Sequence, residues 1–146
     1  MKKVFYLCFI FSVFLSGLHA QHRKKKTNQY VNGMPHGLWM MYIDSNQTRL
    51  ECKGHYTLGR ETGTWKYFHE NGKMRKKEVF RKSGIRSEFY YENGKRKSKG
   101  IAILEPDQNN LHYYFQGKWK YYNEQGKLSS IVYYEHGEEV RTEIVR

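Results

Sequence analysis

The side chains best suited to chemistry are scattered along the chain. Beyond residue 20 none of the histidines stands beside another His, Cys or Asp at a metal-ligand spacing; these are His22, His36, His55, His69, His112 and His136. Cys52 is the one cysteine in that part of the chain. It alternates with Leu50, Gly54 and Tyr56, which favours a buried thiol over a reactive one. The sequence therefore predicts no metal site.

Catalytic and cofactor-binding patterns are missing as well. No G-x-S-x-G elbow surrounds a serine, and no G-x-x-x-x-G-K-[ST] phosphate loop is present. Glu70, Glu92 and Glu124 recur at equivalent positions, as parts of a repeat do, which argues against an acid and base pair. Cys52 with a distant histidine is the one combination left for nucleophilic catalysis. We therefore predict no catalytic residues, no cofactor and no enzymatic activity.

One segment does carry a binding signal, because cations and aromatic rings are interleaved between residues 73 and 99. The predicted patch is Lys73, Arg75, Lys76, Lys77, Arg81, Lys82, Arg86, Phe89, Tyr90, Tyr91, Lys95, Arg96, Lys97 and Lys99. Its eleven cations exceed the three acids Glu78, Glu88 and Glu92 by +8. The rings could stack on sugars or lie at a lipid interface while the cations hold phosphates or carboxylates. A merely solvated strand face is the alternative interpretation.

Residues 1–20, MKKVFYLCFIFSVFLSGLHA, have the pattern of a cleaved signal peptide: Lys2 and Lys3, an apolar run, and Ala20 at the cleavage point. The run is short for the roughly 20 apolar residues of a spanning helix. Loss of its two lysines would lower the net charge from +12 to +10. We expect an exported protein, in the periplasm, the outer envelope or outside the cell. Such a basic protein meets an acidic protein, anionic lipid or acidic glycan sooner than nucleic acid.

The rest of the chain divides into a basic flexible arm, residues 21–29, and one repeat domain, residues 30–146. The frame Y-x-x-G-x-x-x-G-x-W-x-x-[YF] occurs at residues 30–42 and again 26 residues later at 56–68. A G-x-W-x-x-Y core returns at residues 117–122. The residues that define the repeat are Tyr30, Gly33, Gly37, Trp39, Tyr56, Gly59, Gly63, Trp65, Gly72, Gly94, Gly117, Trp119, Gly126, Tyr134 and Gly137.

Three Asn-Gly or Gln-Gly pairs at residues 71–72, 93–94 and 125–126 predict type I′ hairpin turns. The flanking segments alternate with period two and no segment has a helical period, so the fold class is all-β. With 13 Tyr, 8 Phe and 3 Trp the composition favours an elongated single-layer antiparallel sheet of repeated hairpins. The glycines of the G-x-W cores are expected under aromatic rings or at bends.

Two segments depart from this regularity. Residues 80–100 have Phe or Tyr where Trp belongs, which puts the continuity of the sheet there in question. Residues 101–116 form an insertion with turn signals at Pro106-Asp107 and Asn109-Asn110, and we expect it to be the least regular part of the fold.

The frame, followed by x-x-N-G-K, resembles the MORN repeat, specifically the variant of exported bacterial proteins. The resemblance covers residues 30–137 and implies a curved row of β-hairpins that serves in scaffolding, protein binding or attachment near membranes. Some bacterial relatives are labelled antitoxin-like. We therefore predict a non-enzymatic exported scaffold or adaptor that binds a protein partner, an acidic envelope surface, or both. The alternative is an immunity or antitoxin-like protein that blocks a toxin. A free strand edge at residues 134–137 would allow self-association.

Overall fold

The computed structural model describes residues 26–107 and 110–146, so the predicted signal peptide and most of the predicted arm lie outside the described residues. The described chain forms ten strands: β1 (Gln29–Val31), β2 (Met34–Tyr42), β3 (Leu50–Thr57), β4 (Arg60–Phe68), β5 (Met74–Arg81), β6 (Gly84–Tyr90), β7 (Arg96–Asp107), β8 (Asn110–Tyr122), β9 (Leu128–Glu135) and β10 (Glu138–Ile144). No helix in this part of the chain is long and apolar enough to cross a membrane.

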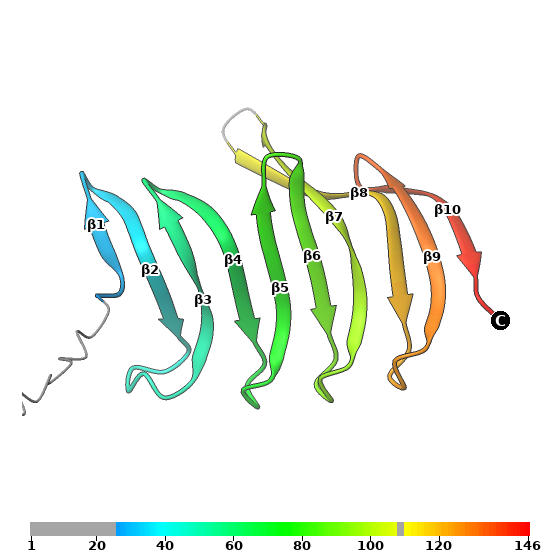
Figure 1. Ribbon diagram of the computed structural model, residues 1–146, viewed down its shortest axis with the longest axis horizontal. Helices are drawn as coiled ribbons and strands as arrows, with labels where there is room; N and C mark the ends of the chain where they lie inside the picture. The colour runs from blue at the N-terminus through cyan, green and yellow to red at the C-terminus, as the bar shows by residue number, and fades with distance from the viewer. Residues whose placement is uncertain (1–25, 108–109) are drawn as a thin grey trace, which may run out of the picture.

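The strands pair in chain order from β1 to β10, each antiparallel to the next. Figure 1 shows them side by side in one elongated, curved row. The predicted all-β, single-layer array of hairpins is therefore confirmed. Because a strand in such a row packs mainly on its chain neighbours, each hairpin is stabilised by the hairpins beside it.

The turns at the two ends of the strands differ in type. At one end three turns have positive φ at both central residues, as type I′ turns require: Asn32-Gly33, Leu58-Gly59 and His136-Gly137. At the other end only the glycine of each Asn-Gly or Gln-Gly pair has positive φ. There Gly72 N–H donates to the His69 carbonyl at 2.9 Å, which marks a type I turn followed by a left-handed glycine. The hairpins are confirmed, but the type I′ assignment of these three turns is wrong.

Each G-x-W core makes a bulge in the sheet. Between β3 and β4 the pairing shifts at Gly54, so that this single residue faces the three residues from Gly63 to Trp65. The Trp65 ring covers Gly54, and a Cβ added there would overlap the ring. Gly63 itself has φ +65° and open space around it. The glycine of the G-x-W core, expected under a ring or at a bend, therefore lies at a bend. The glycine under the ring belongs to the preceding strand.

The same device recurs between β7 and β8, where Trp119 covers Gly100. In both places the indole N–H donates to the carbonyl of the residue after the covered glycine, at 3.2 Å for Trp65 and 2.9 Å for Trp119. Both tryptophans are fully buried. A thin sheet can bury a side chain this large only because the neighbouring strand presents no side chain beneath it.

The face that carries these two rings, here called the tryptophan face, holds two aromatic clusters. The first is a chain of edge-on contacts along β1 to β4, made by Tyr30, Trp39, Tyr56 and Trp65. In the second, on β8 and β9, Phe115 stacks on Trp119 with ring centroids 3.7 Å apart and Tyr134 meets Phe115 edge-on. The opposite face is called the lysine face below.

The sheet runs without interruption through residues 80–100. β5 and β6 pair in continuous register from Lys76 with Phe89 to Arg81 with Gly84. The insertion at 101–116 is also regular, since it extends the β7–β8 hairpin with direct pairs from Ile101 with Gln116 to Asp107 with Asn110. Figure 1 shows this extension reaching beyond the neighbouring turns. Both expected irregularities were wrong because backbone pairing tolerates the altered side chains.

Candidate functional site

The predicted basic and aromatic patch does not form one surface. Successive residues of a strand point to opposite faces, so Lys76 and Phe89 lie on the tryptophan face and Lys77 and Lys99 on the lysine face. Arg81 and Arg86 also belong to the lysine face, whereas Lys73, Lys82 and Lys95 lie at or beside the turns. The two halves of the patch therefore have different neighbours and different chemistry.

Several members of the patch already have partners within the sheet. Buried Glu88 accepts a 2.6 Å hydrogen bond from Tyr90 and lies 3.2 Å from the Arg96 guanidinium and 3.6 Å from that of Arg86. Burial raises the pKa of Glu88, but the Tyr90 hydrogen bond and the Arg96 charge outweigh it and leave that pKa below its ordinary value. Tyr91 donates to the Tyr122 carbonyl at 2.8 Å. These groups brace the sheet, and Lys76 of the patch is likewise ion-paired, with Glu78.

On the lysine face the strand register lines up cations from different strands. Direct pairing partners follow one another across β3 to β8 in a single row: Lys53, Lys66, Lys77, Glu88, Lys99 and Lys120. We call the five lysines of this set the lysine row. Lys53, Lys66 and Lys120 lie outside the patch predicted from the sequence, because only the register reveals that they stand next to its members.

The lysine row has one carboxylate in line with it, Glu88, which stands between Lys77 and Lys99 and is ion-paired to Arg86 and Arg96. Within the described part of the chain none of its five ammonium groups lies within ion-pair distance of a carboxylate. Neighbouring strands are about 4.8 Å apart, and like charges directly opposite each other destabilise a sheet. Lys53, Lys66, Lys99 and Lys120 form such like-charged pairs, and Lys77 stands next to Lys66. An anionic ligand laid across the strands would remove this repulsion.

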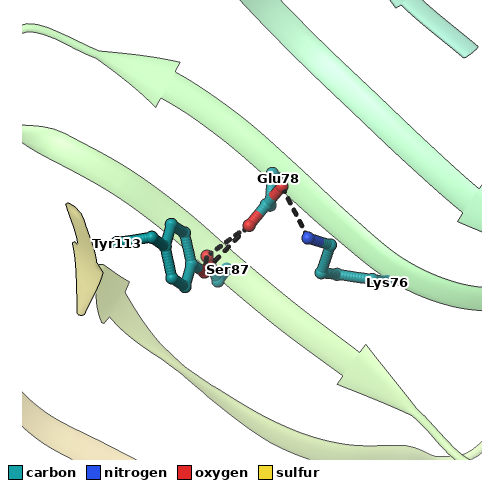
Figure 2. A network of polar contacts seen from close by, with 4 residues as sticks. All are labelled: Lys76, Glu78, Ser87 and Tyr113. Carbon is teal, nitrogen blue, oxygen red and sulfur yellow. Dashed lines mark hydrogen bonds and ion pairs between the residues drawn. The ribbon is translucent and has the colours of Figure 1, made fainter. Parts of the chain in front are cut away.

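The tryptophan face has a polar centre on β5, β6 and β8, formed by Lys76, Glu78, Ser87 and Tyr113 (Figure 2). Glu78 accepts hydrogen bonds from Tyr113 at 2.8 Å and from Ser87 at 3.3 Å, and its other oxygen lies 3.0 Å from the Lys76 ammonium. Lys76 also lies over the Tyr67 ring, 4.2 Å from its centroid. Here the cation is neutralised by its neighbours, in contrast to the lysine row.

A half-buried carboxylate, Glu61, lies at the rim of this centre. It lines a cavity of about 170 Å³ together with Tyr67, Lys76, Glu78 and Tyr113. Burial and then the charge of Glu78 raise the pKa of Glu61. Burial raises the phenol pKa values of Tyr67 and Tyr113 as well, so both hydroxyls keep their protons at neutral pH.

The remaining candidates for chemistry lie apart. Cys52 is buried, as its alternation predicts, and burial raises its thiol pKa to about 11, which keeps it a poor nucleophile. His36, His69 and His136 lie in or near turns. The His136 ring stacks against the Tyr114 ring. In residues 26–107 and 110–146 no three His, Cys, Asp or Glu side chains are grouped to hold a metal ion.

A model of the MORN repeat variant matches residues 61–82, 85–101 and 115–136. Each matched segment contains one hairpin with a left-handed glycine in its turn: β4–β5, β6–β7 and β8–β9. The chain is a MORN repeat protein. The second MORN unit includes the segment that lacks tryptophan, so the family pattern tolerates that departure. Searches of the curated proteins and of the solved structures give no match.

MORN repeats are commonly protein-binding or membrane-binding modules, and the family is generally non-enzymatic. The unit at residues 30–42 lies outside the matched segments but has the same local geometry. Trp39 contacts Tyr30 edge-on, and its indole N–H donates to the Gln29 carbonyl at 3.3 Å. The sheet therefore continues the MORN architecture to its N-terminal edge.

Proposed function

We propose that this MORN protein is an exported, non-enzymatic binding module whose lysine face attaches it to an acidic envelope surface or partner. The observation that carries the proposal is the lysine row. Five cations on strands far apart in sequence stand in one line with buried Glu88, and among the described residues none of the five is within ion-pair distance of a carboxylate. A row that only kept the protein soluble would not need its charges in register.

The signal peptide pattern at residues 1–20 supports the exported location, in the periplasm, the outer envelope or outside the cell. The net charge, +12 for the whole chain and +10 without the two lysines of residues 1–20, supports an acidic target, because long-range attraction raises the rate of encounter with anionic surfaces. In this proposal the tryptophan face remains available to a protein partner, which would make the molecule an adaptor between that partner and the envelope.

The test is charge reversal of the row. Lys66, Lys77 and Lys99 should be changed together to Glu, and binding to envelope membranes and to the extracted acidic components should be measured by sedimentation at low and high salt. Loss of binding at low salt, with an unchanged far-UV spectrum, is the expected result. The matched control is a triple change of Lys73, Lys82 and Lys95 to Glu, which alters net charge equally at the turns. Equal loss in both variants would reject a role for the row.

An immunity or antitoxin-like role is the second candidate. It is supported by a cleft of about 950 Å³ between the β3–β4 and β5–β6 turns and the β7–β8 extension, whose lining includes the exposed side chains of Leu104 and Leu111. Such a protein would bind one toxin tightly and stoichiometrically, and co-expression would protect cells from that toxin. A Leu104→Asp and Leu111→Asp variant should lose protection while the lysine variant above keeps it, if the cleft is the contact surface.

A further inference from the structure

The lysine face has a hollow at the β7–β8 end of the lysine row, beside Lys99 and Lys120. It has a volume of about 240 Å³ and is lined by Arg86, Lys99, Gly100, Ile101, Lys118 and Lys120. Four of its six lining residues are cations, and they come from three strands, β6, β7 and β8. Two of them, Lys118 and Lys120, lie outside the patch predicted from the sequence.

The register explains why the cations converge. Ile101 pairs directly with Arg86 on one side, and Lys99 pairs with Lys120 in the next row. Lys118 and Lys120 point to the same face of β8 because they are two residues apart. Ile101 is 39 % exposed and forms an apolar floor with cations around it. The nearest acid, Glu88, is buried and already engaged by Tyr90 and Arg96.

The chemistry of the hollow favours a phosphate group. A carboxylate offers two oxygens in one plane, whereas a phosphate offers three or more acceptor oxygens in different directions and up to two negative charges. Cations that approach from three strands can each reach a different oxygen of a tetrahedral group. Arginine adds a planar fork of donors that matches phosphate geometry.

The shape of the charged region beyond the hollow favours a linear ligand. From the hollow the row passes buried Glu88 on β6 and continues through Lys77 and Lys66 to Lys53, with one strand about every 4.8 Å. The adjacent row over β4 and β5 consists of Thr64 and Val79, which are uncharged. On this side of the row the cations end at Lys66 and Lys77, so the charges follow a line across the strands, which suits an extended polyanion.

We propose that the lysine face binds a linear phosphate polymer, with its terminal phosphate group in the hollow and the following groups along Lys77, Lys66 and Lys53. The inference rests on the proposed function in that it uses the same face, and it names the class of ligand. Glu88, which lies in the row between Lys99 and Lys77, is buried and its charge is engaged by the Arg86 and Arg96 guanidinium groups.

The experiment is a titration of the purified chain with inorganic phosphate, triphosphate and long-chain polyphosphate, by calorimetry over a series of salt concentrations. Affinity should rise with chain length, because longer chains reach more of the row. A Lys118→Gln and Lys120→Gln variant should bind the long chain about tenfold more weakly. Its slope of log affinity against log salt should be shallower by about one for each lysine removed. The control, Arg60→Gln and Lys127→Gln, changes two exposed cations outside the patch and the row, has the same net charge as the first variant and should bind as the native chain does.

Three results would overturn the inference: affinity that does not rise with chain length, equal losses in the two variants, or binding to phosphatidylglycerol vesicles that long-chain polyphosphate does not compete away. If polyphosphate fails but envelope membranes still bind through the row, the proposed function stands and the ligand class is wrong. If polyphosphate binds as expected but envelope membranes do not, the hollow stands and the proposed envelope attachment fails.

Discussion

Two kinds of hairpin build the tryptophan face, and they solve the same packing problem differently. In the β3–β4 and β7–β8 pairs a buried indole covers a glycine of the preceding strand. In the β5–β6 pair between them there is neither tryptophan nor bulge, and Glu78 pairs directly with Ser87. Glu78 and Ser87 are nonetheless as buried as the tryptophans, at 2 % and 0 % exposure.

The difference shows that the repeat conserves backbone spacing more strictly than side-chain type. One row of paired residues crosses the sheet from Trp65 to Glu78, Ser87 and Gly100, and Gly100 lies under Trp119. The polar pair Glu78 and Ser87 therefore continues the row that the tryptophans form on either side. A buried carboxylate is tolerated only when its oxygens are satisfied, and here Tyr113, Ser87 and Lys76 do so. The insertion that extends β8 supplies Tyr113, so the departure and its compensation occur in the same protein.

The largest effect should come from removing an indole. Trp119→Ala should lower the free energy of unfolding by about 3–5 kcal/mol, because a fully buried ring and its hydrogen bond to Ile101 are lost. Urea unfolding followed by circular dichroism measures it. Trp39→Ala is the matched control, since Trp39 is only half-buried near the edge. If the two variants lose the same stability, burial over glycine is not what distinguishes these hairpins.

The sequence predicts most of this fold because its local signals are strong. Left-handed glycines mark the turns, and alternation marks the strands around them. The type of the turns at Gly72, Gly94 and Gly126 was missed, because Asn-Gly is compatible with both turn types and the loop length decides between them. The glycines under the rings, Gly54 and Gly100, were missed because their partners are on the next strand.

The candidate site was harder to predict, and for a physical reason. Lys53, Lys66 and Lys77 are separated by unequal intervals in the sequence, because bulges shift the register by different amounts between strand pairs. A charge count along the chain finds the dense block at residues 73–99 but cannot assign its members to a face. Lys76 and Lys77 are adjacent in sequence, yet one is neutralised by Glu78 and the other belongs to the lysine row.

The covered glycine gives a sharper test of the tryptophan device. Gly100→Ala should cost about 1–3 kcal/mol, because the new Cβ overlaps the Trp119 ring. In a Trp119→Leu background the same change should cost less than half as much, since a smaller, flexible side chain can move aside. The double-mutant cycle is measured by urea unfolding. Equal costs in the two backgrounds would mean that the Gly100 backbone, and not the ring, excludes a side chain.

The polar pair should be worth less than the indole. Tyr113→Phe removes a 2.8 Å hydrogen bond to Glu78 and should cost about 1 kcal/mol, because Tyr113 is 36 % exposed and water can partly replace it. In a Glu78→Gln background the cost should shrink, since the acceptor is no longer charged. Thermal unfolding of the four variants gives the coupling. A cost that is unchanged by Glu78→Gln would show that Tyr113 stabilises the β7–β8 extension by itself.

The smallest effects should come from two carboxylates on opposite faces of the sheet, Glu61 and Glu88. Their pKa values shift in opposite directions. The pKa of Glu61 is raised, so its ionised form weakens the fold above its ordinary value of 4.5, and the loss is relieved as pH falls through the raised pKa. Glu61→Gln should therefore stabilise the protein slightly at pH 7.

The pKa of Glu88 is lowered, so the ionised carboxylate stabilises the fold above pH 4.5, and this stabilisation disappears as pH falls through the lowered pKa. Glu88→Gln should therefore destabilise the protein at pH 7. If Glu61→Gln also destabilised the protein at pH 7, the ionised Glu61 carboxylate would have to be stabilised by a partner.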